Sequence, residues 1–419
     1  MASGVSGLMS GLDTESIITK TMAIERRPIQ LLQQQEAAYK AKISAFGSLK
    51  GVLADLQTAA ADLKNPSSFA GFSASSGNTT VLDASASSTA VAGTYRVTVS
   101  ALAQAQQVRS SAFTASSEVV GTGTLTITVG TSSAVNVTID STNNTLAGIA
   151  QAINNSTADV TAGVVNDGGN PAKYYLTMAS KKTGASNTIS VTMADADGIN
   201  TDANGLSKLY NNPVAQTMFE TQPAGNAQIS VNGIATERAS NTAIDDLLTG
   251  VTLNLKKADP LSSFDVTVSR DVGSVSSKIQ SFVTKYNTAL TTLKQMQVSS
   301  PETGQIGALQ GDSTPRIVQS RLQSLFFANV DGVASSVNSL RSLGVTGDKD
   351  GKLSFDSTAF ATAYGANRTD VVNFFTQTTA GSEGVALQFN TFLDGYLNSN
   401  SGLLAAKTDG LNRSITHIE

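Results

Sequence analysis

Residues 28–65 read PIQLLQQQEAAYKAKISAFGSLKGVLADLQTAAADLKN, and no other part of the chain has so regular a pattern. Apolar side chains recur in it at heptad spacing, which is typical of a helix that buries one stripe against a partner helix. Asn65-Pro66 ends the predicted helix, because a residue before proline avoids the α region. Pro28 is expected to restart the helix after a shorter one that Asp13 caps and that reaches Arg26. The stripe consists of Leu32, Tyr39, Phe46, Leu49, Leu53, Leu56 and Leu63.

A second stripe with the same spacing lies much further along the chain. It consists of Val275, Ile279, Phe282, Tyr286, Leu293 and Met296. Two helices with one apolar stripe each need a surface that buries it. Either they pack as ordinary helices within one chain, or neighbouring copies share the contact, and the sequence leaves both arrangements open. We call the two stripes together the helix seam and treat them as the candidate assembly site.

Between these helices the pattern changes to short alternating runs, such as TYRVTV at 94–99, LTITV at 125–129 and VTLNL at 251–255. Apolar residues that alternate with Thr, Arg or Asn predict antiparallel sheets with one solvated face. Two segments also repeat the order of strands followed by a helix. The helices are expected to begin at Asn144 and Asn241, with Asp245 and Asp246 in the first turn of the second.

The predicted fold is therefore α+β and multidomain, with a helical, coiled-coil terminal domain formed by both chain ends and two inserted β-rich domains. The helical domain comprises 1–72 and 272–419. One β-rich domain, the plate, comprises 73–107 and 213–271, and the other, 108–212, is inserted in it. Within the C-terminal part we expect a helix from Pro315, a hairpin of 340–345 with 352–355, and helices over 360–375, over 385–397 and from Thr408.

The composition excludes several kinds of catalytic and metal site. The 419 residues include no Cys and one His, so thiolate zinc sites, two-histidine sites and Cys nucleophiles cannot form. Asp348-Lys349-Asp350-Gly351 resembles part of a calcium-binding loop. Thr346 and Ser357, however, occupy the first and last ligand positions of that loop, where carboxylate ligands are expected. A hairpin turn explains these residues better. We expect no enzyme, no cofactor and no metal.

The charge pattern also limits the partners. The 28 Lys and Arg residues are outnumbered by 32 Asp and Glu residues, which gives a net charge of −4 and no basic footprint for nucleic acid. No apolar stretch approaches the ~20 residues of a membrane span. The N-terminus lacks the basic and apolar regions of a cleavable signal peptide. We expect a protein without nucleic-acid binding or membrane insertion, cytoplasmic or exported by an unconventional route.

Short motifs occur in a specific order along nearly the whole chain. The N-terminal motifs are GLMSGLD at 7–13, ERRP at 25–28 and KISAFGSLK at 42–50. Later motifs are GTYRV at 93–97, LAQAQ at 102–106, VNGI at 231–234, GVTL at 250–253, VSRD at 268–271 and AAKTDGLN at 405–412. Each is weak alone, but together they resemble the bacterial flagellar filament-capping proteins, the hook-associated protein 2 family.

This resemblance implies a secreted, non-enzymatic protein at the filament tip outside the cell, exported by the flagellar type III apparatus without a cleaved signal peptide. It implies a ring of identical subunits that helps exported flagellin to fold and insert, and it makes the hook–filament junction proteins further partners. In the family the terminal helices form legs on the filament and the β-rich domains form a plate. An export chaperone is a possible but doubtful partner, because family members continue past AAKTDGLN into a longer helix, whereas this sequence stops at Glu419.

Two other interpretations stay open. Another flagellar axial protein, either a hook–filament junction protein or a flagellin, would also have helical ends, although the terminal motifs of those proteins are not found here. A surface adhesin would instead bind host glycans through its β-rich domains.

Overall fold

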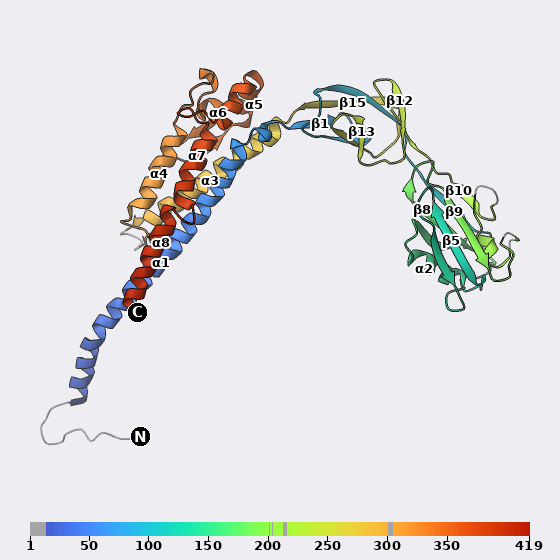
Figure 1. The fold of residues 1–419 in the computed structure, drawn as a ribbon, viewed down its shortest axis with the longest axis horizontal. Helices are drawn as coiled ribbons and strands as arrows, with labels where there is room; N and C mark the ends of the chain where they lie inside the picture. The colour runs from blue at the N-terminus through green and yellow to red at the C-terminus, as the bar shows by residue number, and fades with distance from the viewer. Residues whose placement is uncertain (1–13, 201, 203, 213–215, 301–304) are drawn as a thin grey trace. The chain divides into compact units, whose positions relative to one another are not determined.

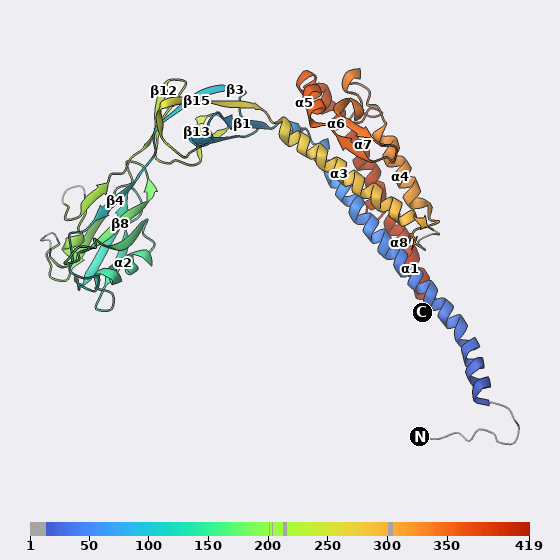
Figure 2. The ribbon, with the colours of Figure 1, turned by 180° about the vertical axis from the view of Figure 1, so that it is seen from behind.

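The computed structural model describes residues 14–200, 202, 204–212, 216–300 and 305–419. The chain forms two compact units, whose elements are labelled in Figure 1 and seen from behind in Figure 2. The helical unit combines the stretch up to Ala70 with Asp271–Glu419, and the β-rich unit is Gly71–Arg270. The β-rich unit is thus an insertion between two parts of the helical unit. The predicted cap Asp13 and the motif at 7–13 lie outside the described residues.

The helical unit is built along one long helix, α1 (Thr14–Lys64). It packs mainly against α3 (Val272–Gln297), α7 (Val385–Leu397) and α8 (Leu403–Ile418). The carboxylate of Asp271 caps α3 by accepting a hydrogen bond from Ser274 N at 2.8 Å, which satisfies a free N–H of the first turn. The remaining helices of this unit are α4 (Ser313–Phe326), α5 (Ser357–Ala366) and α6 (Arg368–Thr376).

Short elements connect these helices. The hairpin of β18 (Val345–Gly347) and β19 (Leu353–Phe355) turns at Gly351, whose φ of 79° suits glycine. The Asp348 carboxylate accepts hydrogen bonds from Asp350 N and Lys352 N, each at 2.8 Å, so it stabilises the turn itself. The other short elements are β16 (Ser299–Ser300), β17 (Gln305–Ile306), and the 3₁₀ turns Pro66–Phe69, Ser335–Val337 and Arg341–Leu343.

The first part of the β-rich unit has two antiparallel sheets. Their strand orders are β1-β15-β3-β11-β12 and β13-β14-β2. Alternate residues of these strands, among them Val97, Leu253 and Val266, are buried in one shared core, as the alternating sequence pattern predicts. The strands are β1 (Phe72–Ser76), β2 (Leu82–Ala86), β3 (Gly93–Ala101), β11 (Ala227–Val231), β12 (Ile234–Arg238), β13 (Ile244–Leu248), β14 (Val251–Leu255) and β15 (Asp259–Arg270).

The second part of the β-rich unit has its own core and two further sheets, of orders β10-β4-β8-β7 and β6-β5-β9. Helix α2 (Leu146–Asn154) buries Leu146, Ile149 and Ile153 in that core. The predicted domain boundary between 107 and 108 falls inside β4. The strands are β4 (Ala105–Arg109), β5 (Gly123–Val129), β6 (Val135–Ile139), β7 (Val160–Asn166), β8 (Tyr174–Thr183), β9 (Ile189–Asp195) and β10 (Phe219–Gln222), with a 3₁₀ turn at Gly205–Leu209.

The expected break in the first helix is wrong, because α1 runs through Pro28 without interruption. Proline removes one backbone donor from a helix interior. Residues 20–35 of α1 are exposed, so the carbonyl that loses its partner can bond water instead. One continuous helix, Thr14–Lys64, therefore replaces the two helices that the sequence predicts.

The expected helix after Asn241 is also wrong. That segment forms β13, in which Ile244 lies opposite Leu253 and Leu248 lies opposite Val251. Only two residues separate β13 from β14, and so short a connection favours a hairpin. Asp245 and Asp246 consequently lie on an exposed strand, where Asp246 pairs with Arg238 at 2.8 Å.

Smaller differences concern element ends. Thr145 rather than Asn144 caps α2, accepting from Gly148 N at 3.1 Å. The helix predicted over 360–375 is divided into α5 and α6 at Asn367, and α8 begins at Leu403 instead of Thr408. The prediction for 385–397 matches α7. Among the residues that the structure describes, no helix is both long and apolar enough to cross a bilayer.

Candidate functional site

The α1 half of the helix seam divides into a buried and an exposed part. Phe46, Leu49, Leu53, Leu56 and Leu63 are almost fully buried. Toward the N-terminus Tyr39 is half-buried, and Leu32 leaves 43% of its surface exposed. The structure thus brings five of the seven predicted residues into one core, which does not include Tyr39 and Leu32.

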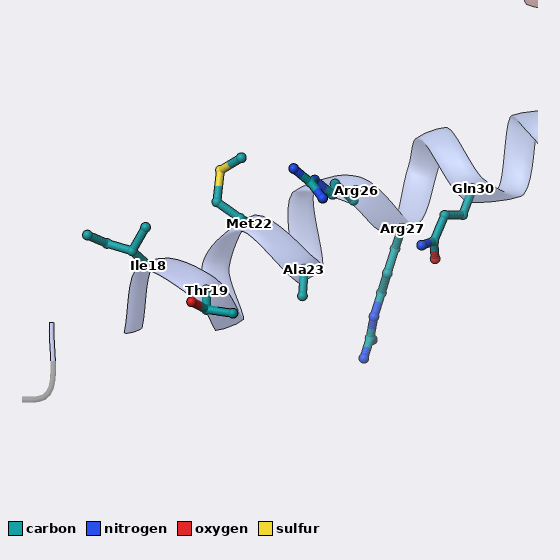
Figure 3. A pocket seen from close by; sticks show the side chains of 7 residues that line it. All are labelled: Ile18, Thr19, Met22, Ala23, Arg26, Arg27 and Gln30. Atoms are coloured by element: carbon teal, nitrogen blue, oxygen red, sulfur yellow. The ribbon is translucent and has the colours of Figure 1, made fainter. Parts of the chain in front are cut away.

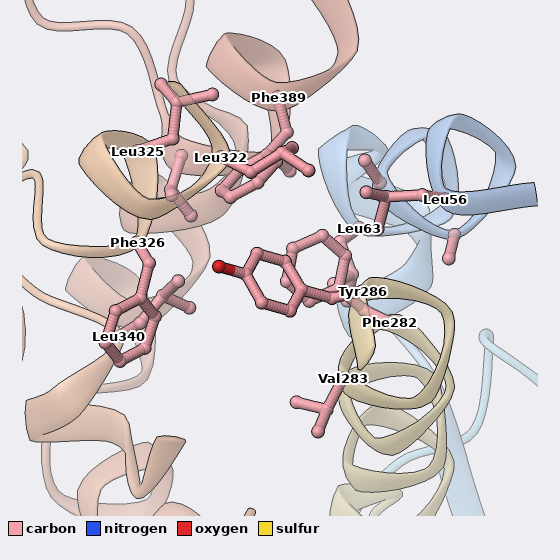
Figure 4. Packing of buried hydrophobic residues seen from close by; sticks show 14 of the residues in the cluster. Leu56, Leu63, Phe282, Val283, Tyr286, Leu322, Leu325, Phe326, Leu340 and Phe389 are labelled. Atoms are coloured by element: carbon pink, nitrogen blue, oxygen red, sulfur yellow. The ribbon is translucent and has the colours of Figure 1, made fainter. Parts of the chain in front are cut away.

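The α3 half of the seam is buried throughout. Val275, Ile279, Phe282, Tyr286, Leu293 and Met296 all lie in the core that contains the buried α1 residues. Figure 4 shows Leu56 and Leu63 of α1, Phe282 and Tyr286 of α3, and Phe389 of α7 gathered in it. The rings of Phe282 and Phe389 meet edge to face, with centroids 5.1 Å apart. A single chain buries these residues, and their role in assembly stays a prediction.

Polar contacts at the edges of this core hold its helices in register. Lys285 Nζ of α3 lies 2.7 Å from Asp55 Oδ2 of α1. The hydroxyl of Tyr364 and the guanidinium of Arg368 both donate to the carbonyl oxygen of Phe69, each at 3.0 Å. The Lys–Asp pair is solvent-exposed and adds at most about 1 kcal/mol. The geometry therefore comes mainly from apolar packing.

A second contact ties the last helix to the bundle. Lys407 Nζ of α8 lies 3.1 Å from Asp312 Oδ2, and the other carboxylate oxygen of Asp312 caps α4 by accepting from Thr314 N. Burial opposes ionisation of Asp312, but the hydrogen bonds from Thr314 and the ion pair with Lys407 outweigh it and lower the pKa of this carboxyl. The contact persists as long as Asp312 is ionised.

Tyr286 is the seam residue with the most perturbed ionisation. Its burial raises the pKa of the phenol from 10 to about 12, because the core disfavours the phenolate. The folded pKa exceeds the unfolded one, so the corresponding stability is complete below pH 10 and is lost as the pH rises through 12.

We expect the helical unit to lose roughly 3 kcal/mol of unfolding free energy between pH 10 and 12 through Tyr286 alone. Urea unfolding followed by circular dichroism at successive pH values measures this loss. Tyr286→Phe removes the ionisation and should show a correspondingly smaller decline. Tyr39→Phe, which removes the same hydroxyl from a half-buried tyrosine outside this core, is the comparison variant. An equal decline in Tyr286→Phe and wild type would contradict the assignment.

The N-terminal half of α1 exposes a band of large apolar side chains. Exposed fractions reach 62% at Ile18, 48% at Met22 and 60% at Leu31. Figure 3 shows Ile18, Met22 and Arg26 on one side of the helix, and among the described residues the shallow hollow beside them is lined by α1 alone. The heptad pattern predicts apolar residues at Leu32 and beyond, but it gives no sign that this half of the helix is uncovered.

The first turn of α8, which precedes the predicted start at Thr408, belongs to the bundle as well. Leu404 is buried there against the same core. Gly402 precedes the turn, and a Cβ at that position would lie 2.3 Å from Asn398 O, so the tight approach requires glycine. The Leu403-Leu404 pair after a glycine is the sequence signal that could have located this helix. The described residues contain no cluster of three or more His, Cys, Asp or Glu side chains suited to a metal.

Comparison with known proteins gives a consistent result along the chain. The profile described as Flagellar hook-associated protein 2 N-terminus matches residues 10–106, and that described as Flagellar hook-associated protein 2 C-terminus matches residues 224–419. B-type flagellar hook-associated protein 2 of Pseudomonas aeruginosa is 30% identical over 434 residues, covering 99% of this chain and 88% of the relative. Flagellar hook-associated protein 2 of Escherichia coli K12 is 29% identical, covering 98% and 88%.

A solved structure extends the similarity to three dimensions. It is the crystal structure of the D1-D2-D3 domains of the flagellar cap protein FliD from Escherichia coli, which is 28% identical in sequence. The superposition has a TM-score of 0.66 and covers 88% of this chain and 99% of the solved one. The similarity therefore includes elements of both the helical and the β-rich units.

Proposed function

The chain belongs to the flagellar hook-associated protein 2 family, and we propose that it is the structural, non-catalytic cap at the distal end of a bacterial flagellar filament. The observation that carries this proposal is the similarity to the flagellar cap protein of Escherichia coli across 88% of the chain.

The cap is proposed to act outside the cell as a ring of identical subunits that promotes the folding and insertion of exported flagellin. Hook–filament junction proteins and an export chaperone are further proposed partners. We keep the division into 1–72 with 272–419, 73–107 with 213–271, and 108–212 as a proposal for the leg, the plate and the inserted domain. The separate cores of the two β-rich parts support a division near these bounds, with Met218 and β10 packed in the inserted domain.

The exposed half of α1 gives the leg its proposed role at the filament. Helical segments without tertiary partners are marginal in water, because nucleation is costly and packing supplies most of the stability of a helix. Ile18, Met22 and Leu31 offer apolar surface that a partner can bury. Such a segment can adjust its contacts as each flagellin subunit is added beneath it.

We expect fluorescently labelled protein to bind purified filaments at one end only. Labelling along the filament would favour a flagellin-like role, and labelling at the base would favour a junction role. Native mass spectrometry of the same preparation should show a closed oligomer in place of a monomer. A strict monomer at high concentration, with no end labelling, would contradict the proposed function.

A further inference from the structure

Leu261 is the most exposed large apolar side chain in the part of the chain that the structure describes, at 96%. It lies in β15, where the pairing with β3 jumps from Asp259 opposite Val99 to Phe264 opposite Val97. Four residues of β15 therefore oppose a single residue of β3, and such bulges redirect side chains out of the sheet. We call residues 260–263 the knob.

The knob is anchored at both ends. Pro260 fixes its own φ at the start of the bulge. At the other end the hydroxyl oxygens of Ser263 and Thr98 lie 2.9 Å apart, within hydrogen-bond distance. Leu261 is consequently held out from the sheet in a defined position and is not carried on a long loop.

A hollow of about 450 Å³ lies on the other side of β3 in the same sheet. Its lining includes exposed Ser100 of β3 and exposed Ala235 and Glu237 of β12. Its lining includes the small side chains of Ser100, Ser230 and Ala235, which leave room for a leucine side chain. The full lining is Ser100, Gln228, Ile229, Ser230, Ala235, Thr236 and Glu237.

The charges beside the knob and the hollow are complementary. Lys257, four residues before Leu261, is exposed and takes part in none of the ion pairs among the described residues. Glu237 at the rim of the hollow accepts a hydrogen bond from Asn226, and its carboxylate is in none of the ion pairs among the described residues. Opposite charges at the knob and at the hollow favour contact between a knob and a hollow over contact between two knobs or two hollows.

Knob and hollow lie on opposite sides of β3, so one subunit cannot fill its own hollow with its own knob. Two different complementary surfaces on one subunit make a head-to-tail contact, and such contacts generate a ring when the rotation closes. We propose that Leu261 of each subunit inserts into the hollow of the next, with Lys257 facing Glu237, and that this contact closes the ring. The inference rests on the proposed ring and names the surfaces that form it.

Two single variants each remove one side of this contact. Leu261→Asp removes the knob and leaves the hollow, whereas Ala235→Arg fills the hollow and leaves the knob. Each should raise the concentration for half-assembly at least tenfold in sedimentation velocity. Both positions are exposed, so far-UV circular dichroism should match the wild type. Val119→Asp, which alters a side chain with 64% exposure in the segment before β5, is the control and should assemble normally.

Mixing the two variants is the decisive measurement. The knob of Ala235→Arg fits the hollow of Leu261→Asp, but neither surface remains to extend the pair, so one-to-one pairs without rings are expected. Lys257→Glu and Glu237→Lys should likewise each weaken assembly, and the double variant should recover it. Normal rings of Leu261→Asp, or a mixture without pairs, would overturn this interface while the ring proposal stands. Wild-type protein that never assembles would overturn both.

Discussion

Replacing Leu53 and Leu56 together by aspartate is expected to unfold the helical unit and to abolish binding at the filament end. Both side chains are fully buried between α1 and its partner helices. Truncating one buried leucine already costs about 2–5 kcal/mol, and burying an unpaired carboxylate adds to that cost. The sum approaches or exceeds the roughly 5–15 kcal/mol that stabilises a whole domain.

The β-rich unit should survive this double substitution, because its two cores contain no residue of α1. Circular dichroism should therefore lose the helical signal near 222 nm while the sheet signal persists. The matched control is Leu31→Asp with Leu32→Asp, which places the same two charges on the exposed part of the same helix. It should keep the helical signal. Unchanged end binding by Leu53→Asp/Leu56→Asp would count against the proposed role of the seam.

Truncation of Phe282 to alanine is expected to destabilise the helical unit by about 3–5 kcal/mol without unfolding it. The ring is 3% exposed and contacts the ring of Phe389, so its removal leaves a cavity between α3 and α7 that neighbouring side chains fill only in part. For a unit of this size the corresponding fall in melting temperature is roughly 10 °C.

Thermal and urea unfolding of the full chain measure this change. Phe327→Ala provides the comparison, since that ring is 72% exposed at the end of α4 and its loss should alter stability by less than about 0.5 kcal/mol. If both variants lost equal stability, Phe282 would not hold the place in the core that the structure assigns to it. Ring assembly by Phe282→Ala should persist at temperatures below its lowered transition.

Local sequence patterns predict most of the helices and strands. The exceptions depend on contacts between residues that are distant in the sequence or on solvent exposure. A proline in the sequence predicts the start of a helix more readily than a position inside one. Pro28 nevertheless lies inside α1, and the solvent exposure of that part of the helix is what allows it there. Asn241 has the chemistry of a helix cap, yet its side chain exchanges hydrogen bonds with the backbone of Ala103, accepting at 2.7 Å and donating at 2.8 Å. Residues so far apart in the chain leave no local pattern.

The seam shows the same division between local and distant information. Periodicity identifies which face of α1 is apolar, because that depends only on the spacing of residues along one helix. Periodicity does not reveal where along α1 the other helices cease to cover its apolar face, because that depends on the positions of α7 and α8. Exposure of Leu32 and burial of Phe46 therefore could not be told apart before the fold was known.

The insertion of the β-rich unit has a consequence for how such chains diversify. The polypeptide leaves the helical unit at Ala70 and rejoins it at Asp271, and the first and last strands of the insert pair, with Phe72 opposite Arg270. The chain thus enters and leaves the β-rich unit through two adjacent, paired strands, β1 and β15. A unit inserted in this way can be enlarged, shortened or exchanged by recombination without disturbing the packing of the helices.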